Sequence, residues 1–209
     1  MRTIDQSKPI LVTGGTGYLA SWIIKQLLDE GKEVRTTVRD LSQKDKSAHL
    51  TALAVKSKGT LTLFEADLLK TGSFAEAMSG DAVDIQKTAN GIFTEEQWNF
   101  SSSVDHQPYP YSKTLAEKLA WEMAGKQNRW DLLTINPGFI MGPSLSKRTD
   151  SSSIDIMIQL ATGKFKTGVP SGEMGFVDVR DVAKSHIMAG FSPTASGRHI
   201  CVSDQKTFL

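Results

Sequence analysis

The sequence predicts an α/β protein built on a doubly wound parallel sheet. Three observations support this fold class. Strand-like apolar runs alternate with helix-like segments through the first 80 residues, a glycine-rich turn follows the first run, and the alternation resumes after residue 108. Alternating strands and helices are typical of a parallel sheet with helices on its faces. The length of 209 residues fits one domain, or one domain with a small attached lobe.

The first half of the chain contains three strand–helix units. Each predicted strand is a short apolar or β-branched run, and each predicted helix carries apolar residues on one face. Gly31 supplies a stop for the first helix. We expect strands at 9–13, 33–39 and 60–67, and helices at 19–29, up to 53–57, and from 73 to 78.

The second half continues the alternation. A helix follows the stretch DHQPYPYSKTLAEK, and Leu115, Leu119 and Met123 line one of its faces. We expect a strand within 130–143, a helix at 153–161, a strand at 175–179 that leads into a helix from residue 180, and a last strand at 197–202.

Composition excludes several classes of partner. The formal net charge is +1, so neither nucleic acid nor an acidic membrane surface is an expected partner. Cys201 is the only cysteine, which rules out an internal disulfide, and the four histidines lack the spacing of metal ligands, so we expect no metal. Without a signal-like start or a run of roughly 20 apolar residues, the chain reads as a soluble, cytoplasmic protein.

The glycine-rich turn predicts a nucleotide site. Residues 13–20 read TGGTGYLA and fit the GxGxxG/A pattern between a strand and a helix. Glycines allow a tight turn and a close approach of the backbone to a pyrophosphate, and the helix N-terminus offers free N–H groups. Ala20 is small enough to keep the helix close to the strand. A glycine turn without a ligand is the alternative.

The end of the second strand favours NADP(H) over NAD. Arg39 lies 22 residues after Gly17, and Lys44 follows closely. An acidic residue at this place would bind the ribose 2′-hydroxyl, whereas an arginine can bind a 2′-phosphate. Asp40 is a possible ribose ligand, and a solvated strand end is the plain alternative.

Tyr109 and Lys113 form the candidate catalytic pair. Four residues apart on a helix, they share one face. A nearby ammonium favours the phenolate of a tyrosine, which makes the phenol a usable acid or base near neutral pH. Tyr111 lacks a lysine at its own i+4 position and is the weaker candidate. Because a proline disfavours helical geometry in the residue before it, Pro110 places Tyr109 toward the helix cap.

Six motifs in order resemble those of the extended short-chain dehydrogenase/reductases: TGGTGYLA, TVRD, ADL at 66–68, YPYSK, NPGFIMGP and FVDVRDVA. The likeness is to the branch of dihydroflavonol reductases, cinnamoyl-CoA reductases and microbial aldehyde or ketone reductases. It implies a Rossmann-type domain with a small C-terminal substrate lobe. By resemblance, Tyr109 is the proton donor and Lys113 its helper and a ribose ligand. The other implied cofactor-binding residues are Gly14, Thr16, Gly17, Tyr18, Leu19, Arg39, Lys44, Asp67, Leu68, Pro137, Gly138 and Ile140.

The family pattern needs more chain than is present. Between Gly80 and Thr94 lie 13 residues, too few for the strand, crossover helix and strand that should precede the catalytic tyrosine. The serine that ends the second of these strands is not found, and Ser101, Ser102 and Ser103 are poor substitutes. We expect a longer protein whose central strands and C-terminal helices are left out of this sequence; a real deletion variant is the alternative.

The predicted domains are a dinucleotide-binding domain at 1–145, with its internal gap near 83–91, and a substrate lobe at 146–209 from which 176–190 returns to the first domain. The predicted function is NADP(H)-dependent reduction of a small-molecule aldehyde or ketone by a monomer or homodimer. Two alternatives remain. One is an NAD-dependent sugar-nucleotide epimerase or dehydratase, and the other is an inactive NADP-binding sensor or scaffold.

Overall fold

The computed structural model describes residues 4–66, 93–147, 149, 151–166, 168 and 172–207. The helix expected at 73–78 and the end of the strand at Asp67 lie outside these residues. The elements are β1 (Ile10–Val12), α1 (Tyr18–Asp29), β2 (Glu33–Val38), α2 (Lys44–Lys56), β3 (Thr60–Glu65), α3 (Pro108–Gly125), β4 (Leu133–Pro137), β5 (Phe139–Met141), α4 (Ser152–Ala161), β6 (Glu173–Asp178), α5 (Val179–Phe191), β7 (Gly197–Cys201) and β8 (Asp204–Thr207).

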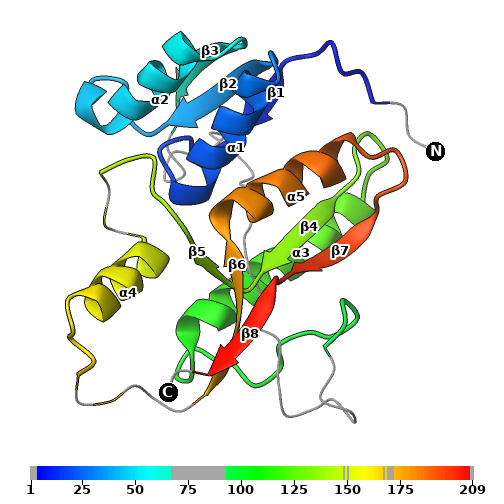
Figure 1. The fold of residues 1–209 in the computed structure, drawn as a ribbon. Helices are drawn as coiled ribbons and strands as arrows, with labels where there is room; N and C mark the ends of the chain where they lie inside the picture. The colour runs from blue at the N-terminus through cyan, green and yellow to red at the C-terminus, as the bar shows by residue number, and fades with distance from the viewer. Residues whose placement is uncertain are drawn as a thin grey trace.

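The N-terminal sheet has the predicted parallel order β1-β2-β3 (Figure 1). Its core is apolar and is shared between the strands and the two helices that follow β1 and β2. Ile24 and Leu28 of α1, Val34 of β2 and Leu50 of α2 are all fully buried in one cluster. These residues recur at helical or strand spacing, which is why the sequence pattern located their elements correctly.

The C-terminal strands form two smaller sheets. β4 pairs in parallel with β7, while β6 pairs in parallel with β5 and antiparallel with β8. The single strand expected within 130–143 is therefore two strands, divided at Gly138. A Cβ at Gly138 would lie 2.4 Å from the carbonyl oxygen of Gly175 in β6, so the close crossing of the chains requires glycine. Strand β8 carries no clear sequence signal and was not predicted.

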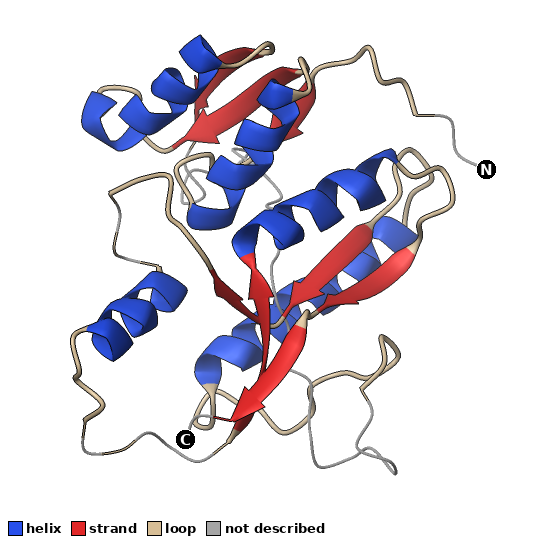
Figure 2. Cartoon of the chain, viewed as in Figure 1, coloured by secondary structure: helices blue, strands red, loops and turns tan. Residues whose placement is uncertain are grey.

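The α/β class is confirmed, but the described strands do not form one continuous sheet (Figure 2). Among the described residues, β1 pairs only with β2 and β4 only with β7. Leu11, at the middle of β1, is 59% exposed, which is unusual for a strand at the centre of a doubly wound sheet. The two strands that the sequence analysis expects to be left out would lie here, between β1 and β4.

Helix α1 connects the two halves of the molecule. It packs against α5 (Figure 1). Three residues on one face of α1, each four positions from the next, donate side-chain hydrogen bonds to backbone carbonyls of the second half. Tyr18 bonds Gly142 at 2.7 Å, Trp22 bonds Pro143 at 2.8 Å and Gln26 bonds Arg180 at 2.9 Å. The start of α1 is thus fixed to the loop after β5.

Helix α3 begins differently from the sequence prediction. Its apolar stripe is partly open to solvent, with Leu115, Leu119 and Met123 each about half exposed. Tyr109 lies inside the first helical turn and not at the cap, because Pro108 starts the helix and Gln107 is the N-cap with a left-handed φ of 55°. A proline at the first helical position fits helix geometry well, and its fit outweighs the bias that Pro110 imposes on Tyr109.

Candidate functional site

The glycine-rich turn has the geometry of a phosphate-binding loop. Gly14 has a left-handed φ of 63°, and its N–H donates to the Thr37 hydroxyl at 3.0 Å. Gly17 is the N-cap of α1, and its N–H donates to the Gly14 carbonyl at 2.8 Å. A Cβ at Gly17 would lie 3.0 Å from that carbonyl, so a side chain would crowd the turn. The first-turn N–H groups of α1 lack intrahelical partners, as an anion site requires.

Two residues behind the turn were missed by the sequence reasoning. The buried Ser21 hydroxyl lies 3.0 Å from the Gly15 carbonyl and 2.7 Å from the Gly17 carbonyl, and His49 Nε2 of α2 lies 3.1 Å away. A hydroxyl has one proton to donate, so a His49 tautomer with the proton on Nε2 suits this arrangement. The pair links the carbonyls of the loop to α2.

The other predicted residues of the turn divide between backbone and side-chain roles. The partly buried side chains of Leu19 and Ile140 pack against a second apolar cluster, formed by Ile135, Val177 and Val182. Thr16 is half-buried in the loop. The Tyr18 hydroxyl is held by Gly142; burial, and secondly the charge of Asp178, raises the pKa of Tyr18 to about 12. Tyr18 is therefore a fixed neutral donor.

The end of β2 has the arrangement expected of a 2′-phosphate site. Arg39 is exposed directly after β2, and Lys44 is exposed at the first position of α2. Neither forms an ion pair with another described residue. The Asp40 carboxylate accepts from Ser42 N–H at 2.8 Å, from the Ser42 hydroxyl at 2.6 Å and from Gln43 at 2.6 Å, and these bonds lower the pKa of Asp40. The carboxylate oxygens of Asp40 accept hydrogen bonds within the turn, while Arg39 and Lys44 form no ion pair among the described residues.

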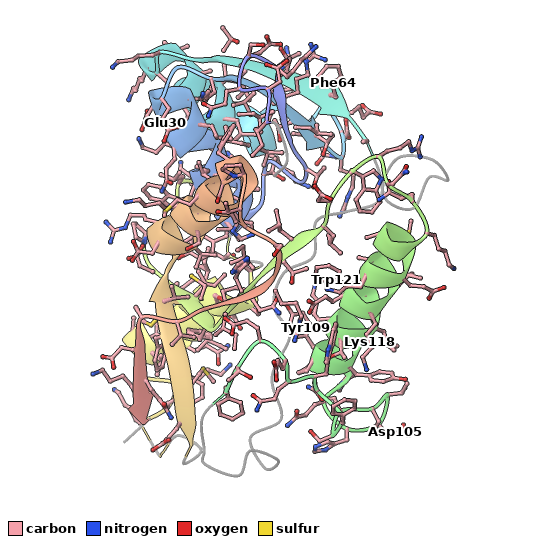
Figure 3. All side chains as sticks on the ribbon, turned by 90° about the vertical axis from the view of Figure 1, so that its right-hand side faces the viewer. Glu30, Phe64, Asp105, Tyr109, Lys118 and Trp121 are labelled. Carbon is pink, nitrogen blue, oxygen red and sulfur yellow. The ribbon has the colours of Figure 1, made fainter. Side chains whose placement is uncertain are left out.

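Tyr109 and Lys113 lie on one face of α3, as their spacing predicts. The Lys113 ammonium is 5.5 Å from the centroid of the Tyr109 ring, within the range of a cation–π contact. Tyr109 is 60% exposed and lies in the first turn of the helix. Figure 3 labels Tyr109 and Trp121, which lie near the two different ends of α3. Tyr111 is half-buried. An accessible phenol beside an ammonium is suited to proton transfer.

Of the remaining residues predicted to bind the cofactor, some lie at the end of β4 and some lie outside the described residues. Pro137 ends β4, and the N–H of Gly138 is used in a bond to the Cys201 carbonyl at 3.1 Å. Asp67 and Leu68 lie outside the described residues. Among the described residues, no hydrogen bond or ring contact joins Tyr109 to the glycine turn or to Arg39; Tyr109 contacts Lys113 of its own helix.

The serines before α3 and the histidines do not form a catalytic or metal site among the described residues. Ser102 and Ser103 belong to a turn before α3, in which Ser103 N–H donates to the His106 carbonyl at 2.7 Å, and His106 is exposed there. Within the described ranges, no three His, Cys, Asp or Glu side chains are grouped as metal ligands. In the same ranges, no helix has the length and apolar character needed to cross a membrane.

An open groove between α2 and β3 lies apart from Tyr109 and Lys113. It is mostly apolar and has a volume of about 680 Å³. Lys44 is its only predicted site residue. The lining residues are Leu41, Lys44, Ser47, Ala48, Thr51, Ala52, Val55, Lys56 and Leu63.

Comparison with known families and proteins agrees with the predicted family. Residues 87–202, more than half of the chain, match the model of the NAD dependent epimerase/dehydratase family, and residues 6–101 match the NmrA-like family. The chain is 33% identical to tetraketide alpha-pyrone reductase 1 of Arabidopsis thaliana, over 96% of this chain and 78% of that protein.

Two solved structures share the fold and more than two thirds of their length with this chain. Vestitone reductase from alfalfa is 28% identical with a TM-score of 0.74, over 95% of this chain and 78% of that one. Gre2 from Candida albicans in complex with NADPH is 25% identical with a TM-score of 0.75, over 95% and 79%.

The alignment also gives the length of chain that the relative has and this sequence lacks. The alignment with the Arabidopsis relative extends over 261 positions, whereas 96% of this chain is about 201 residues, so about 60 positions have no residue here. Two strands and a crossover helix fit this length. A relative that is 33% identical over 96% of this chain and a family model that covers more than half of the chain lead to one conclusion: the chain belongs to the NAD-dependent epimerase/dehydratase family, within the extended short-chain dehydrogenase/reductases.

Proposed function

We propose that this chain is an NADP(H)-dependent oxidoreductase that reduces an aldehyde or ketone to an alcohol, with Tyr109 as proton donor and Lys113 as its helper. The observation that carries the proposal is the ammonium of Lys113 at 5.5 Å from the ring of an accessible Tyr109, on the helix that the family uses for catalysis. Two of the similar proteins named above, tetraketide alpha-pyrone reductase 1 and vestitone reductase, are reductases by name, which supports the same class of reaction.

The cofactor proposal rests on the loop and on the end of β2. The glycine turn and the start of α1 would hold a pyrophosphate, and the unpaired Arg39 and Lys44 would meet a 2′-phosphate. Asp40 is committed to its own turn, which removes the carboxylate that NAD would need. This favours a reductase that uses NADP(H) over an epimerase that uses NAD. When bound, NADPH would supply the hydride.

The protein's part of the reaction is a proton transfer. As the substrate carbonyl carbon gains the hydride, its oxygen becomes an alkoxide and takes the proton of the Tyr109 hydroxyl. The positive charge of Lys113 stabilises the phenolate that remains. Residues 146–209 would supply the substrate lobe, while 176–190 returns to the cofactor domain through β6 and α5, whose contact with α1 supports that part of the assignment.

A second candidate is a sensor or scaffold that binds NADP without turnover. The observation in its favour is that about 60 aligned positions of the relative have no residue here, while the sequence offers too few residues between Gly80 and Thr94 for the strand that would carry the catalytic serine. A missing carbonyl-polarising hydroxyl would lower the rate strongly, because a single oxyanion-stabilising donor contributes on the order of 10²–10³ in rate.

Turnover and binding, measured together, separate the two candidates. NADPH consumption is followed by absorbance with a panel of aldehydes and ketones, and NADPH affinity by fluorescence. For a reductase, Tyr109→Phe lowers kcat by about 10²–10⁴-fold and leaves the Kd for NADPH within about threefold. Tyr111→Phe is the matched control and keeps its turnover. Wild-type binding without turnover on any substrate favours the sensor, and equal turnover of Tyr109→Phe and wild type refutes the catalytic assignment.

A further inference from the structure

We propose that Glu117 and Arg198 form a positioning pair that sets where α3 presents Tyr109 and Lys113. The inference rests on the proposed function, since it assigns a role in the same reaction. Neither residue was predicted from the sequence, and neither touches the reacting atoms. The pair is a buried salt bridge between α3 and β7, with Arg198 Nε 2.8 Å from Glu117 Oε1 and side chains that are 9% and 4% exposed.

Glu117 is bonded from three directions. Its Oε1 also accepts from the Thr134 hydroxyl of β4 at 2.9 Å and from the Trp121 indole of α3 at 3.1 Å. Its Oε2 accepts from Arg198 Nη2 at 3.2 Å and from the Asn136 amide at 3.4 Å. Thr134 and Asn136 are two apart on one strand, so they share the face of β4 toward the helix. The carboxylate therefore ties α3 to two neighbouring strands at once.

Arg198 extends the attachment to the segment before α3. Its Nη1 donates to the carbonyls of Glu95 and Gln97, both at 2.6 Å, and its guanidinium carbon lies 3.9 Å from the centroid of the Trp98 ring. The ammonium of Lys118 in α3 lies 5.4 Å from the centroid of the same Trp98 ring. A planar guanidinium with this many fixed donors allows little rotation or translation of its partners.

The spacing along α3 converts this anchor into a position for the catalytic pair. Tyr109, Lys113 and Glu117 are four residues apart in turn, so they follow one another along one face at about 6 Å per step. Fixing Glu117 fixes the rotation and the axial place of that face. Glu117 is held by β4, which ends at Pro137, the residue that the resemblance places beside the nicotinamide. The network thus relates the proton donor to the cofactor.

The rest of α3 offers little competing attachment. Thr114 and Glu117 are the only buried residues of this helix, and its apolar stripe faces solvent. An apolar contact is tolerant of rotation, whereas a bidentate ion pair with five further bonds is directional. Buried ion pairs are weak contributors to stability and are better explained by the arrangement they specify. The Glu117–Arg198 pair, with its directional bonds to neighbouring strands, fits the role of specifying an arrangement.

The test compares turnover with folding in four variants. Glu117→Gln keeps the size of the side chain and removes its charge, Arg198→Lys keeps the charge and removes the fork, and Glu117→Met with Arg198→Met replaces the pair by apolar side chains. Glu122→Gln is the matched control on the same helix, since Glu122 pairs only with the exposed Lys126. Each variant is measured for kcat, KM, the Kd for NADPH and Tm.

For a positioning pair, the double Met variant and Glu117→Gln lose about 10- to 100-fold in kcat, because small displacements of a catalytic group cost this much, while the Kd for NADPH stays within about threefold. Glu122→Gln matches wild type. A folded double Met variant with wild-type kcat would overturn the proposal. If that variant does not fold, Glu117→Gln decides the question by the same criterion.

A readout independent of turnover separates this inference from the proposed function. The chain has three tyrosines, so 3-fluorotyrosine gives few fluorine resonances, and the one lost in Tyr109→Phe is assigned to Tyr109. In Glu117→Gln the Tyr109 resonance shifts and that of Tyr18 does not. An unmoved Tyr109 resonance refutes positioning even in an inactive protein. Wild type without turnover but with a shifted resonance refutes the proposed reaction and keeps the geometric role of the pair.

Discussion

Helices α1 and α3 are attached to the molecule by opposite means. α1 buries Ile24, Leu27 and Leu28 almost completely in the N-terminal core. α3 turns Leu115 and Leu119 to solvent and buries a glutamate. Each helix begins beside a predicted functional motif, the glycine turn for α1 and the Tyr109–Lys113 pair for α3. The two kinds of attachment differ in how strictly they fix the rotation of the helix.

Apolar packing and a buried ion pair have different consequences for a functional residue. Apolar burial supplies stability roughly in proportion to area and without direction, which suffices for α1 because its site consists of backbone groups at its end. A side-chain site needs a defined rotation of the helix. The bonds of Glu117 to β4 and β7 supply that direction at α3.

Removing the polar anchor of α3 has the largest expected effect. Glu117→Ala leaves the Arg198 guanidinium buried without its carboxylate, which costs about 3–5 kcal/mol of the free energy of unfolding, since an uncompensated buried charge is left behind. Urea denaturation of wild type and variant measures the difference. A loss below about 1 kcal/mol, the range of an exposed ion pair, would show that the pair is open to water in solution.

Truncating the apolar anchor of α1 is expected to cost slightly less. Leu28 is fully buried, so Leu28→Ala removes its transfer free energy and leaves a cavity, at a cost of about 2–5 kcal/mol in the free energy of unfolding. The same denaturation experiment gives the value. NADPH binding by the folded fraction stays near that of wild type, because Leu28 lies about three helical turns after Gly17. A selective loss of binding would contradict this separation.

The fold was predictable where apolar spacing determined the structure. The runs at 9–13, 33–39 and 60–67 and the helices between them follow from periods that are local in sequence. Strand β8 was not predicted, since four mostly polar residues become a strand only by pairing with β6. The break at Gly138 was also missed, because the approach of Gly175, 37 residues later, requires it.

The site was predictable where a motif is contiguous. The glycine turn, Arg39 and the Tyr109–Lys113 spacing could be recognised from the sequence, and their roles in the site stay predictions. Glu117 could not be singled out, since a glutamate among the charged residues of a helix predicts a solvated face. Its partner Arg198 lies 81 residues away, and only the folded chain brings the two together.

The junction between the halves has a smaller, pH-dependent contribution. Asp178 caps α5 by accepting from Arg180 N–H at 2.8 Å and also binds the Arg180 guanidinium, which lowers the pKa of Asp178. Asp178→Asn keeps the cap and removes the ion pair, at a cost below about 1 kcal/mol near neutral pH. A lowered folded-state pKa stabilises above the unfolded value of about 3.9, and the stabilisation is lost as pH falls through the lower value.

Urea midpoints of wild type and Asp178→Asn, taken from about pH 7 down to about pH 3, measure this contribution. The advantage of wild type should be constant down to the unfolded pKa and should shrink below it. An advantage that grew on acidification would mean that the carboxyl is destabilised in its ionised form, contrary to its bonds with Arg180.

The smallest expected effect is at the exposed stripe of α3. Leu119 is 56% exposed, so Leu119→Ala should change the free energy of unfolding by less than about 0.5 kcal/mol, whereas the same substitution at Leu28 costs several times more. Denaturation at low and high protein concentration provides the measurement. A loss above about 2 kcal/mol would mean that the stripe is covered in solution. Dependence of that loss on concentration would identify the cover as a second copy, and independence would identify it as the chain's own residues. In both cases α3 would have an apolar attachment after all, and the contrast with α1 would be one of degree.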